Sequence, residues 1–593
     1  MYEPLETKSK EIRLLLLQPG TWTDPISCQL KRIPLKDALR KYEALSYAWD
    51  AEPGVNEIFV NGQPCPIKRN LFLALRRLRK ATEPRIMWAD ALCIDQQSND
   101  EKSHQVVLMR EIYQSCIRVF LWLGDYRTIS LDARTVEDGM KNEPEFWTRN
   151  DNMLQAFNMI NELATGKHFH ELLCYHEDNE RRPFDRGTLE GFMALVSSSW
   201  WNRLCIKMET DTETSNCRVV QEYVLSPQAI VICGSLSAPM QMFSTAVENA
   251  AKHGGGCCQK SWAKLRSNQA NDMMLLWRKV KDLGQPQDFR DWAKFYRTLL
   301  YHRNRKASDP RDMIYGLSAL APYIPNELVP DYTLSRQEVY RRLALCLINT
   351  QAKLHVLKGQ RTLNNNLPSW IYDWSSDPDD ELYYIECQRL EIEGYRASKD
   401  TKPMVQSHSD GRISVDGVLF DRVVQMGQAC ERNPSGRLKA MRDWYSLNAN
   451  KHPSPTVWRE NFLRTVTGDA AYSLNSDSSK NRIIVRAPVD QEDVFDAWLK
   501  HMESPIAHRS SGDDSVDMFD DLVRIMTRGL KFFLTERGFM GIGNAEIGDE
   551  IWILLGGDVP FLLRRDTASS GTALFVESWM ERFWKTSKQE QEQ

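Results

Sequence analysis

Polar and acidic side chains follow three predicted strands at the points where those strands end. They are Ser46, Tyr47, Trp49 and Asp50 after the first strand, Asp90, Cys93, Asp95 and Gln96 after the second, and Gly124 and Asp125 after the third. In an open parallel sheet, ligands bind outside the carboxyl ends of the strands. Carboxylates there can orient hydroxyl groups, and aromatic rings can stack on a planar ligand. The alternative is structural, because Asp and Asn at strand ends also cap the helices that follow.

The segments around these residues alternate between strand-like and helix-like patterns. Strands are expected at Tyr42–Trp49, Arg85–Ala89 and Arg118–Leu123, a hairpin around Asn61-Gly62, and helices after Asn70 and after Ser98. Asn70 is expected to cap the first helix, and Ser98 with Glu101 is expected to form a capping box for the second. This β–α–β–α–β order favours an α/β fold with a mostly parallel sheet and helices on its faces.

The character of the sequence changes along the chain. Residues 236–350 are helix-rich, with a helix expected around Glu338–Leu347, and residues 435–530 also look helical. From about residue 365, short β-branched segments bounded by turns predict strands at Arg412–Phe420, Arg482–Ala487, Lys531–Leu534, Glu550–Leu555, Val559–Leu563 and Leu574–Val576. We expect an α/β domain at 1–235, a helical segment at 236–360, a mixed α+β, β-rich domain at 361–588, and a disordered tail at 589–593.

Composition excludes several classes of protein. The chain has 593 residues, and its net charge of −4 argues against nucleic acid as a partner. No run of about 18 apolar residues occurs, so no membrane-spanning helix is expected. The 13 cysteines include no C-x-x-C pair, and no secretion signal is evident. A reducing, intracellular and cytoplasmic location is expected.

Two groups of residues resemble functional motifs but lack the context that those motifs need. Gly538, Gly541 and Gly543 are not followed by a clear helix, so a β-turn is expected there instead of a dinucleotide-binding loop. A second group could imitate a zinc cluster; it comprises His168, His170, Cys174 and His176. Its spacing matches no standard structural zinc site and no second ligand pair is evident, so a polar helix end is expected and no metal is assigned. P-loop, zincin and nucleophile-elbow motifs are absent from the sequence.

Four ordered blocks closely resemble the HET (heterokaryon incompatibility) domain family of filamentous fungi. They are Tyr42 to Trp49, Trp88 to Gln96, Gln105 to Gly124, and Trp201 with Arg203 and Val219 to Glu222. Together they cover roughly residues 42–225. Downstream segments around Asp309 to Leu317, Leu367 to Trp374 and Thr535 to Arg564 resemble one large subgroup of the family, so the resemblance extends over the whole chain.

This resemblance implies a role in nonself recognition, in which incompatible cell fusion triggers programmed cell death. HET domains also look like distant relatives of TIR domains, which implies a three-layer α/β fold. Some TIR enzymes cleave NAD with a Glu that follows a Trp, and the similar position in this sequence is Glu222. A polar insertion at 205–217 separates Arg203 from Gln221 and Glu222, which departs from the pattern of the family.

Two functional hypotheses follow from the resemblance and the residues. In the first, the protein is an NAD glycohydrolase in which Glu222 assists the departure of nicotinamide as the sugar becomes positively charged. Its substrate contacts would come from residues at the strand ends: Ser46, Tyr47, Trp49, Asp90, Asp95 and Gln96. In the second, the protein is a signalling module without catalysis, which self-associates or binds a protein partner. Structural roles are the alternative for each residue, with Trp49 in the core and Glu222 paired with Arg203.

Overall fold

A computed structural model describes most of the chain. The described residues are 2–49, 55–125, 151–176, 184–202, 225–254, 257–258, 295–296, 299–300, 309–318, 325–358, 367–376, 385, 389, 395–447, 454–474, 482–486, 492–504, 513–565 and 573–577. The chain divides into two compact units, residues 1–339 and residues 340–593, and each unit is described by itself. The predicted domain boundaries at 235 and 360 stay predictions. Within the described ranges, no helix is both long and apolar enough to cross a membrane.

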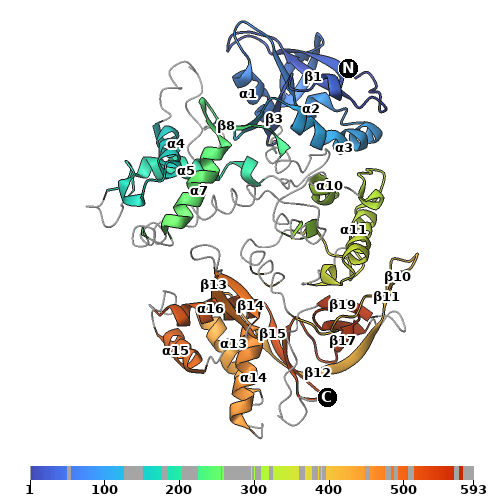
Figure 1. Ribbon diagram of the computed structural model, residues 1–593, viewed down its shortest axis with the longest axis vertical. Helices are drawn as coiled ribbons and strands as arrows, with labels where there is room; N and C mark the ends of the chain where they lie inside the picture. Colours follow the sequence, from blue (N-terminus) through green and yellow to red (C-terminus); the bar gives the residue numbers. More distant parts are fainter. Residues whose placement is uncertain are drawn as a thin grey trace. The chain divides into compact units, whose positions relative to one another are not determined.

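The N-terminal unit contains a nine-stranded mixed sheet and a set of helices (Figure 1). Its strands are β1 (Glu11–Leu17), β2 (Ser27–Pro34), β3 (Glu43–Tyr47), β4 (Val55–Val60), β5 (Gln63–Lys68), β6 (Arg85–Trp88), β7 (Val119–Trp122), β8 (Ala229–Cys233) and β9 (Leu236–Pro239). Its helices are η1 (Leu35–Asp37), α1 (Arg69–Leu78), α2 (Asp90–Cys93), α3 (Asn99–Ser115), α4 (Asp151–Ala164), η3 (Phe169–Glu171), α5 (Arg186–Val196), η4 (Ser199–Asn202), α7 (Met240–Gly254), α10 (Asp312–Ser318), η5 (Asn326–Leu328) and the start of α11 (Arg336–Gln351). The strand order is β5-β4-β2-β1-β6-β3-β7-β8-β9.

Four adjacent strands, β6, β3, β7 and β8, run parallel and form the core of this sheet. Ala44 on β3 lies opposite both Trp88 on β6 and Val119 on β7, and Tyr47 lies opposite Trp122. All four residues of β7 are buried, as expected for a central parallel strand covered on both faces. The predicted α/β class is therefore confirmed. Antiparallel strands extend the sheet on both sides, with β1 pairing with β6 and β9 pairing with β8.

The predicted hairpin at Asn61-Gly62 is confirmed between β4 and β5. Both turn residues have positive φ angles, 53° for Asn61 and 79° for Gly62, which is the geometry of a type I′ turn. The side-chain oxygen of Asn61 also accepts a hydrogen bond from the backbone of Leu30 on β2 at 2.9 Å. The turn therefore fixes the register of the hairpin and attaches it to β2, its parallel neighbour.

Helices α4, α5 and α7 form a group, and the backbones of α4 and α5 approach each other closely at Gly191. Helix α4 packs against α5 and α7. A Cβ atom added at Gly191 of α5 would lie 2.0 Å from the backbone oxygen of Asn152 in α4. At Gly187, one turn earlier, the nearest atoms are side-chain oxygens, with Asn152 Oδ1 at 2.6 Å. Gly191 therefore permits a contact between two helix backbones that no larger residue allows.

Gly191→Ala is expected to destabilise the protein although alanine favours helices more than glycine does. The methyl group would meet an immovable carbonyl and push α5 away from α4, at a cost of about 1–3 kcal/mol in the free energy of unfolding. Gly187→Ala is the matched control, since only the ends of flexible side chains must move. Urea denaturation of both variants measures the difference, and equal stabilities would contradict the proposed close approach.

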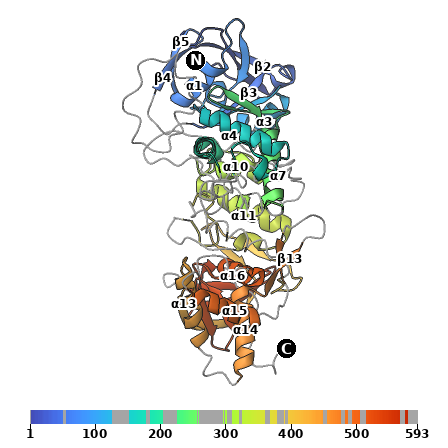
Figure 2. The same ribbon diagram turned by 90° about the vertical axis from the view of Figure 1, so that its left-hand side faces the viewer.

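The C-terminal unit combines an antiparallel sheet with four long helices (Figure 2). Its strands are β10 (Val405–Ser407), β11 (Ile413–Val415), β12 (Gly417–Ala429), β13 (Ala470–Leu474), β14 (Arg482–Arg486), β15 (Lys531–Thr535), β16 (Met540–Gly543), β17 (Glu550–Leu554), β18 (Phe561–Arg565) and β19 (Ala573–Glu577). Its helices are η6 (His355–Leu357), α13 (Pro434–Ser446), α14 (Pro455–Thr467), α15 (Glu492–Glu503) and α16 (Asp514–Thr527), with the remainder of α11. The main sheet has the order β16-β15-β12-β17-β18-β19, and two further hairpins pair β10 with β11 and β13 with β14.

The four helices pack against strands β12, β15 and β16 around a core that is rich in tryptophan. Trp444 of α13, Trp458 of α14 and Trp498 of α15 are all fully buried, and Phe532 of β15 stacks on Trp444 with ring centroids 5.8 Å apart. The predicted β-rich character with helices at 435–530 is confirmed. Five of the six predicted strands correspond to β14, β15, β17, β18 and β19, whereas the strand predicted at Arg412–Phe420 is divided between β11 and the start of β12. Amphipathic helices that cover one face of an antiparallel sheet are typical of the α+β class.

Glycines shape the turns of the main sheet. Gly538 has a φ of 82° in the turn between β15 and β16, so the turn expected at this glycine-rich segment is confirmed. Gly556, between β17 and β18, has a φ of 81°, and an added Cβ atom would lie 2.4 Å from the Pro403 side chain. This position therefore needs glycine both for its backbone angle and for the close approach of another segment.

Asp558, in the loop after Gly556, lies among three basic side chains. Lys353 Nζ is 2.9 Å from Asp558 Oδ1, Lys358 Nζ is 3.6 Å from Oδ2, and His355 also contacts Oδ2. Burial acts to raise the pKa of this carboxyl, but the hydrogen bonds from His355 and Lys353 and the charge of Lys358 outweigh it. The pKa of Asp558 therefore lies well below its ordinary value.

Asp558→Asn is expected to lower the free energy of unfolding by about 1–3 kcal/mol at neutral pH, because charge-assisted hydrogen bonds are lost. Since the folded-state pKa is depressed, the carboxylate stabilises the fold above the unfolded pKa of about 4 and loses this effect as the pH falls further. The difference in stability between the wild type and the variant should therefore shrink progressively as the pH falls from about 4 toward the depressed pKa of the folded state. Urea titrations monitored by circular dichroism at several pH values measure this, and a difference that is independent of pH would contradict it.

Candidate functional site

The carboxyl ends of the four parallel strands meet at one edge of the N-terminal sheet. Because Ala44 is level with Trp88 and Val119, the segments that begin at Ala48, Ala89 and Leu123 leave the sheet at the same edge. Most of the candidate residues lie in these three segments or just before them. The parallel register of β6, β3 and β7 therefore brings the three strand ends together, as predicted.

Asn70 connects two of these strand ends and was expected only as a helix cap. The cap position of α1 is Lys68, and Asn70 lies inside the first turn, where its side chain is buried. Its Nδ2 donates to the backbone oxygen of Ala48 at 2.6 Å, and its Oδ1 accepts from Trp122 Nε1 at 2.7 Å. The capping prediction for Asn70 is wrong because these buried partners satisfy its amide better than a helix end exposed to water would.

Ser46 forms a second buried connection, to the segment after α5. Trp200 Nε1 donates to Ser46 Oγ at 2.8 Å, and both side chains are almost completely buried. The Ser198 hydroxyl, two residues before Trp200, donates to the backbone oxygen of Leu123 at 2.6 Å. The first block of the family resemblance therefore packs directly on Trp200, the residue before the fourth block. The Ser46 hydroxyl is therefore buried and already accepts a hydrogen bond from within the protein.

The two aromatic candidates at the end of β3 stack on each other. The rings of Tyr47 and Trp49 are nearly parallel, with centroids 6.4 Å apart and an interplanar angle of 17°. Tyr47 is buried, whereas Trp49 is half-buried, so part of the Trp49 ring faces solvent. The indole nitrogen of Trp49 is buried and has no hydrogen-bond partner among the described residues. Of the two rings, Trp49 is the one that could receive a planar ligand.

Asp90 and Gln96 lie on either side of the short helix α2. The Asp90 side chain is only 2 % exposed, and its Oδ1 accepts a hydrogen bond from the Ala91 backbone at 2.8 Å. Gln96 Nε2 donates to the backbone oxygen of Asp90 at 3.0 Å, while Gln96 Oε1 is buried without a partner in the described part of the chain. The Gln96 carbonyl is thus a buried acceptor whose hydrogen-bonding capacity is unused among the described residues.

Asp95 is positioned by a buried ion pair that the sequence did not indicate. Arg13 of β1 is 2 % exposed, and its guanidinium contacts both carboxylate oxygens of Glu101, at 2.5 and 2.9 Å. Glu101 Oε1 also accepts from the backbone of Asp95 at 2.7 Å, while Asp95 Oδ1 accepts from Gln97 at 3.0 Å. The loop that carries Asp95 is therefore held from both sides.

The capping box predicted at Ser98 and Glu101 forms in one direction only. Ser98 Oγ accepts from the backbone of Glu101 at 3.2 Å and caps α3, as predicted. The Glu101 carboxylate does not return to Ser98, because it binds Arg13 and Asp95 instead. A buried cation is a stronger partner for a carboxylate than a backbone amide at a helix end.

Cys93 and Asp125 complete the described part of this edge. Burial raises the pKa of the Cys93 thiol to about 12, so this cysteine is not a nucleophile at neutral pH. Asp125 follows β7, and its charge acts on Arg77 of α1. Burial lowers the pKa of Arg77 and the charge of Asp125 opposes that shift. Arg77 and Asp125 are therefore close enough for their opposite charges to interact.

Several candidates lie outside the described residues. They are Asp50, Arg203, Gln221, Glu222 and the polar insertion at 205–217. The structure therefore does not relate Glu222 to the strand ends. Among the described candidates, it places Trp49, Asp90, Asp95 and Gln96 at one edge of the sheet, with Ser46 and Tyr47 buried beneath it. This set can stack on a ring and can form hydrogen bonds with polar groups.

Asn70→Ala is expected to lower the free energy of unfolding by about 2–4 kcal/mol. It leaves two buried groups, the Trp122 indole N–H and the Ala48 carbonyl, without partners, at roughly 1–3 kcal/mol each. Asn99→Ala, at an exposed position in the first turn of α3, is the control and is expected to change stability by less than about 0.5 kcal/mol. Urea denaturation monitored by tryptophan fluorescence measures both. Equal stabilities would show that Asn70 does not join the strand ends.

A comparison with protein families matches part of the N-terminal unit. Residues 42–204 match the family model described as "Heterokaryon incompatibility protein (HET)". This range contains β3 to β7 and the segment as far as η4, which are the elements that form the strand edge described above. The expected family resemblance is thereby confirmed for residues 42–204, a range that ends before Val219 to Glu222 of the fourth block.

A curated relative extends the similarity over both units. The chain is 24 % identical to "Heterokaryon incompatibility protein 6, OR allele" from Neurospora crassa, over an alignment that covers 94 % of this chain and 91 % of the relative. The chain therefore resembles nearly the full length of that protein. No solved structure matches the chain significantly.

Proposed function

We propose that this protein acts in heterokaryon incompatibility, the nonself recognition that follows fusion of incompatible fungal cells and ends in programmed cell death. The observation that carries the proposal is the extent of the similarity to the Neurospora protein, which covers 94 % of this chain. A shared domain alone would align only the N-terminal unit. An alignment across both units supports a function that needs the whole chain.

Packing within the N-terminal unit agrees with this proposal. Residues of the blocks that carry the HET resemblance form hydrogen bonds with other segments of this unit, with Ser46 accepting from Trp200 and Gln105 donating to the Glu11 backbone at 2.9 Å. Such contacts make the matched region one folded domain with a single edge of parallel strand ends. We infer that the N-terminal domain has a three-layer TIR-like fold and that this edge of its sheet is the signalling part of the protein.

The C-terminal unit would then recognise the trigger or a second copy of the chain. Strand β12 carries Val418 and Val424, which are 64 % and 44 % exposed, and Ile547 in the loop before β17 is 67 % exposed. Exposed apolar side chains of this kind support contact with a protein partner. Self-association or binding of a protein partner is therefore part of the proposal, as is action inside the cell.

A TIR-like NAD glycohydrolase would signal by chemistry, and a binding module would signal by assembly. The enzyme would use Glu222 against the sugar, Trp49 to stack on a ring, and Asp90, Asp95 and Gln96 to hold polar groups. Both mechanisms end in cell death, so cell death alone does not separate them. NAD consumption does.

Inducible expression of the full chain in hyphae is expected to stop growth and to let a membrane-impermeant dye enter the cells. If NAD is cleaved, purified protein at several concentrations should release nicotinamide, and Glu222→Gln should reduce both the release and the killing by about 100-fold or more, as loss of an acid–base group does. Liquid chromatography of nicotinamide and counts of dye-positive cells are the two measurements.

Glu209→Gln is the matched control, because Glu209 is another acidic residue, in the insertion at 205–217. It should leave both readouts unchanged. Killing by the Glu222→Gln variant without NAD loss assigns the protein to the binding modules and leaves the incompatibility role intact. Healthy hyphae at full expression, both alone and after fusion with strains of different genotype, would overturn the proposed function itself.

A further inference from the structure

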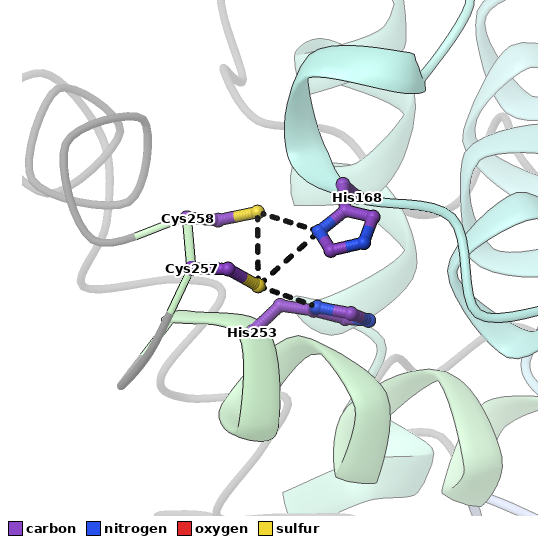
Figure 3. A group of neighbouring side chains, drawn as sticks. All are labelled: His168, His253, Cys257 and Cys258. Carbon is purple, nitrogen blue, oxygen red and sulfur yellow. Dashed lines mark hydrogen bonds between the residues drawn. The ribbon is translucent and has the colours of Figure 1, made fainter.

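Four metal-ligating side chains meet in the N-terminal unit, away from the strand edge described above. They are His168, His253, Cys257 and Cys258, and one ligand atom from each lies within 4.8 Å of the others (Figure 3). His168 precedes η3, His253 is in the last turn of α7, and the two cysteines follow that helix. Residues 90 positions apart in the sequence are therefore brought to one point.

The distances between these atoms fit tetrahedral coordination. His168 Nδ1 is 3.2 Å from Cys257 Sγ and 3.4 Å from Cys258 Sγ, and His253 Nδ1 is 3.2 Å from Cys257 Sγ. The two sulfur atoms are 4.0 Å apart, so they are not joined in a disulfide. Around a zinc ion, the edges of the tetrahedron would be about 3.5 Å between nitrogen and sulfur and about 3.8 Å between two sulfurs.

Surrounding contacts hold the four side chains in place. Asn249, one turn before His253, donates to the backbone oxygens of Leu163 and Ala164 at 2.9 and 3.2 Å, which ties the end of α7 to the end of α4. The Phe169 backbone donates to the Cys258 thiol, and the His253 ring is hydrogen-bonded to the Gly166 backbone. Backbone groups that orient the ligands in this way are typical of metal sites in proteins.

We propose that His168, His253, Cys257 and Cys258 bind one structural zinc ion, which clamps the end of α7 to the segment between α4 and η3. Two thiolates with two imidazoles in a tetrahedron select zinc, whereas magnesium and calcium prefer oxygen ligands. Four protein ligands close the coordination sphere, so the ion stabilises the fold and does not bind substrate. This inference does not depend on the proposed function.

The zinc site differs from the sequence motif that was considered and set aside. Of His168, His170, Cys174 and His176, only His168 belongs to it. His170 is exposed, Cys174 is buried, and His176 Nε2 contacts Asp185 Oδ1 at 2.7 Å. The other three ligands come from the end of α7 and from the two cysteines that follow it, with the spacing H-x-x-x-C-C.

Metal analysis of the full-length protein tests the proposal. Protein purified without chelator is expected to contain one zinc ion per chain by plasma mass spectrometry. After removal of the metal, addition of Co²⁺ should produce the visible bands of a tetrahedral ion and a thiolate charge-transfer band. Cys257→Ser and His168→Asn are each expected to weaken zinc binding about 100-fold or more in competition with a chromophoric chelator.

His170→Asn is the matched control, because this exposed histidine is next to the cluster and its ring centroid is only 5.4 Å from that of His168. It should retain one zinc ion. Since Cys257 is exposed, its replacement by serine should leave the circular dichroism spectrum unchanged, and loss of zinc then reflects the missing ligand. Zinc-free wild-type protein with no Co²⁺ bands, a disulfide between Cys257 and Cys258, or equal zinc in all variants would overturn the proposal.

Discussion

The buried guanidinium of Arg13 is the interaction on which the N-terminal unit depends. A charge removed from water is costly unless it is paired and fully hydrogen-bonded, and Arg13 meets this demand only when three segments are in place. Glu101 at the start of α3 supplies the opposite charge, and the Cys93 backbone oxygen accepts at 3.2 Å. Strand β1, the end of helix α2 and helix α3 must therefore assemble together. Any shift of one of them leaves a buried charge without its partner.

The same pairing of buried polar groups explains the strand edge. Ser46, Asn70, Trp122 and Trp200 use their polar atoms on one another and on backbone, so the floor of the edge is rigid and closed. The groups that remain to contact other molecules are the half-buried ring of Trp49 and the charged side chains of Arg77 and Asp125. A site of this kind is fixed in shape before anything binds, which limits the entropy that binding must overcome.

Local patterns predicted much of the fold because they act over a few residues. Alternation of side chains located β3, short segments bounded by turns located β7 and several strands after residue 412, and the Asn61-Gly62 pair located a hairpin. The side-chain roles of Arg13 and Asn70 could not be predicted in this way, since their partners are decided by tertiary packing. For His168 the reason is the same, because its neighbours lie about 90 residues away and no local spacing links them.

Strand β12 has a consequence for the order in which the C-terminal unit is made. Its first half pairs with β17 and its second half with β15, and both partners lie more than 100 residues later in the chain. On the ribosome, β12 and the helices α13 to α16 emerge before β15 and β17, the two strands that pair with β12. The nascent unit must hold an unpaired, partly apolar strand until synthesis is nearly finished, and it is then open to chaperones and to incorrect strand pairing.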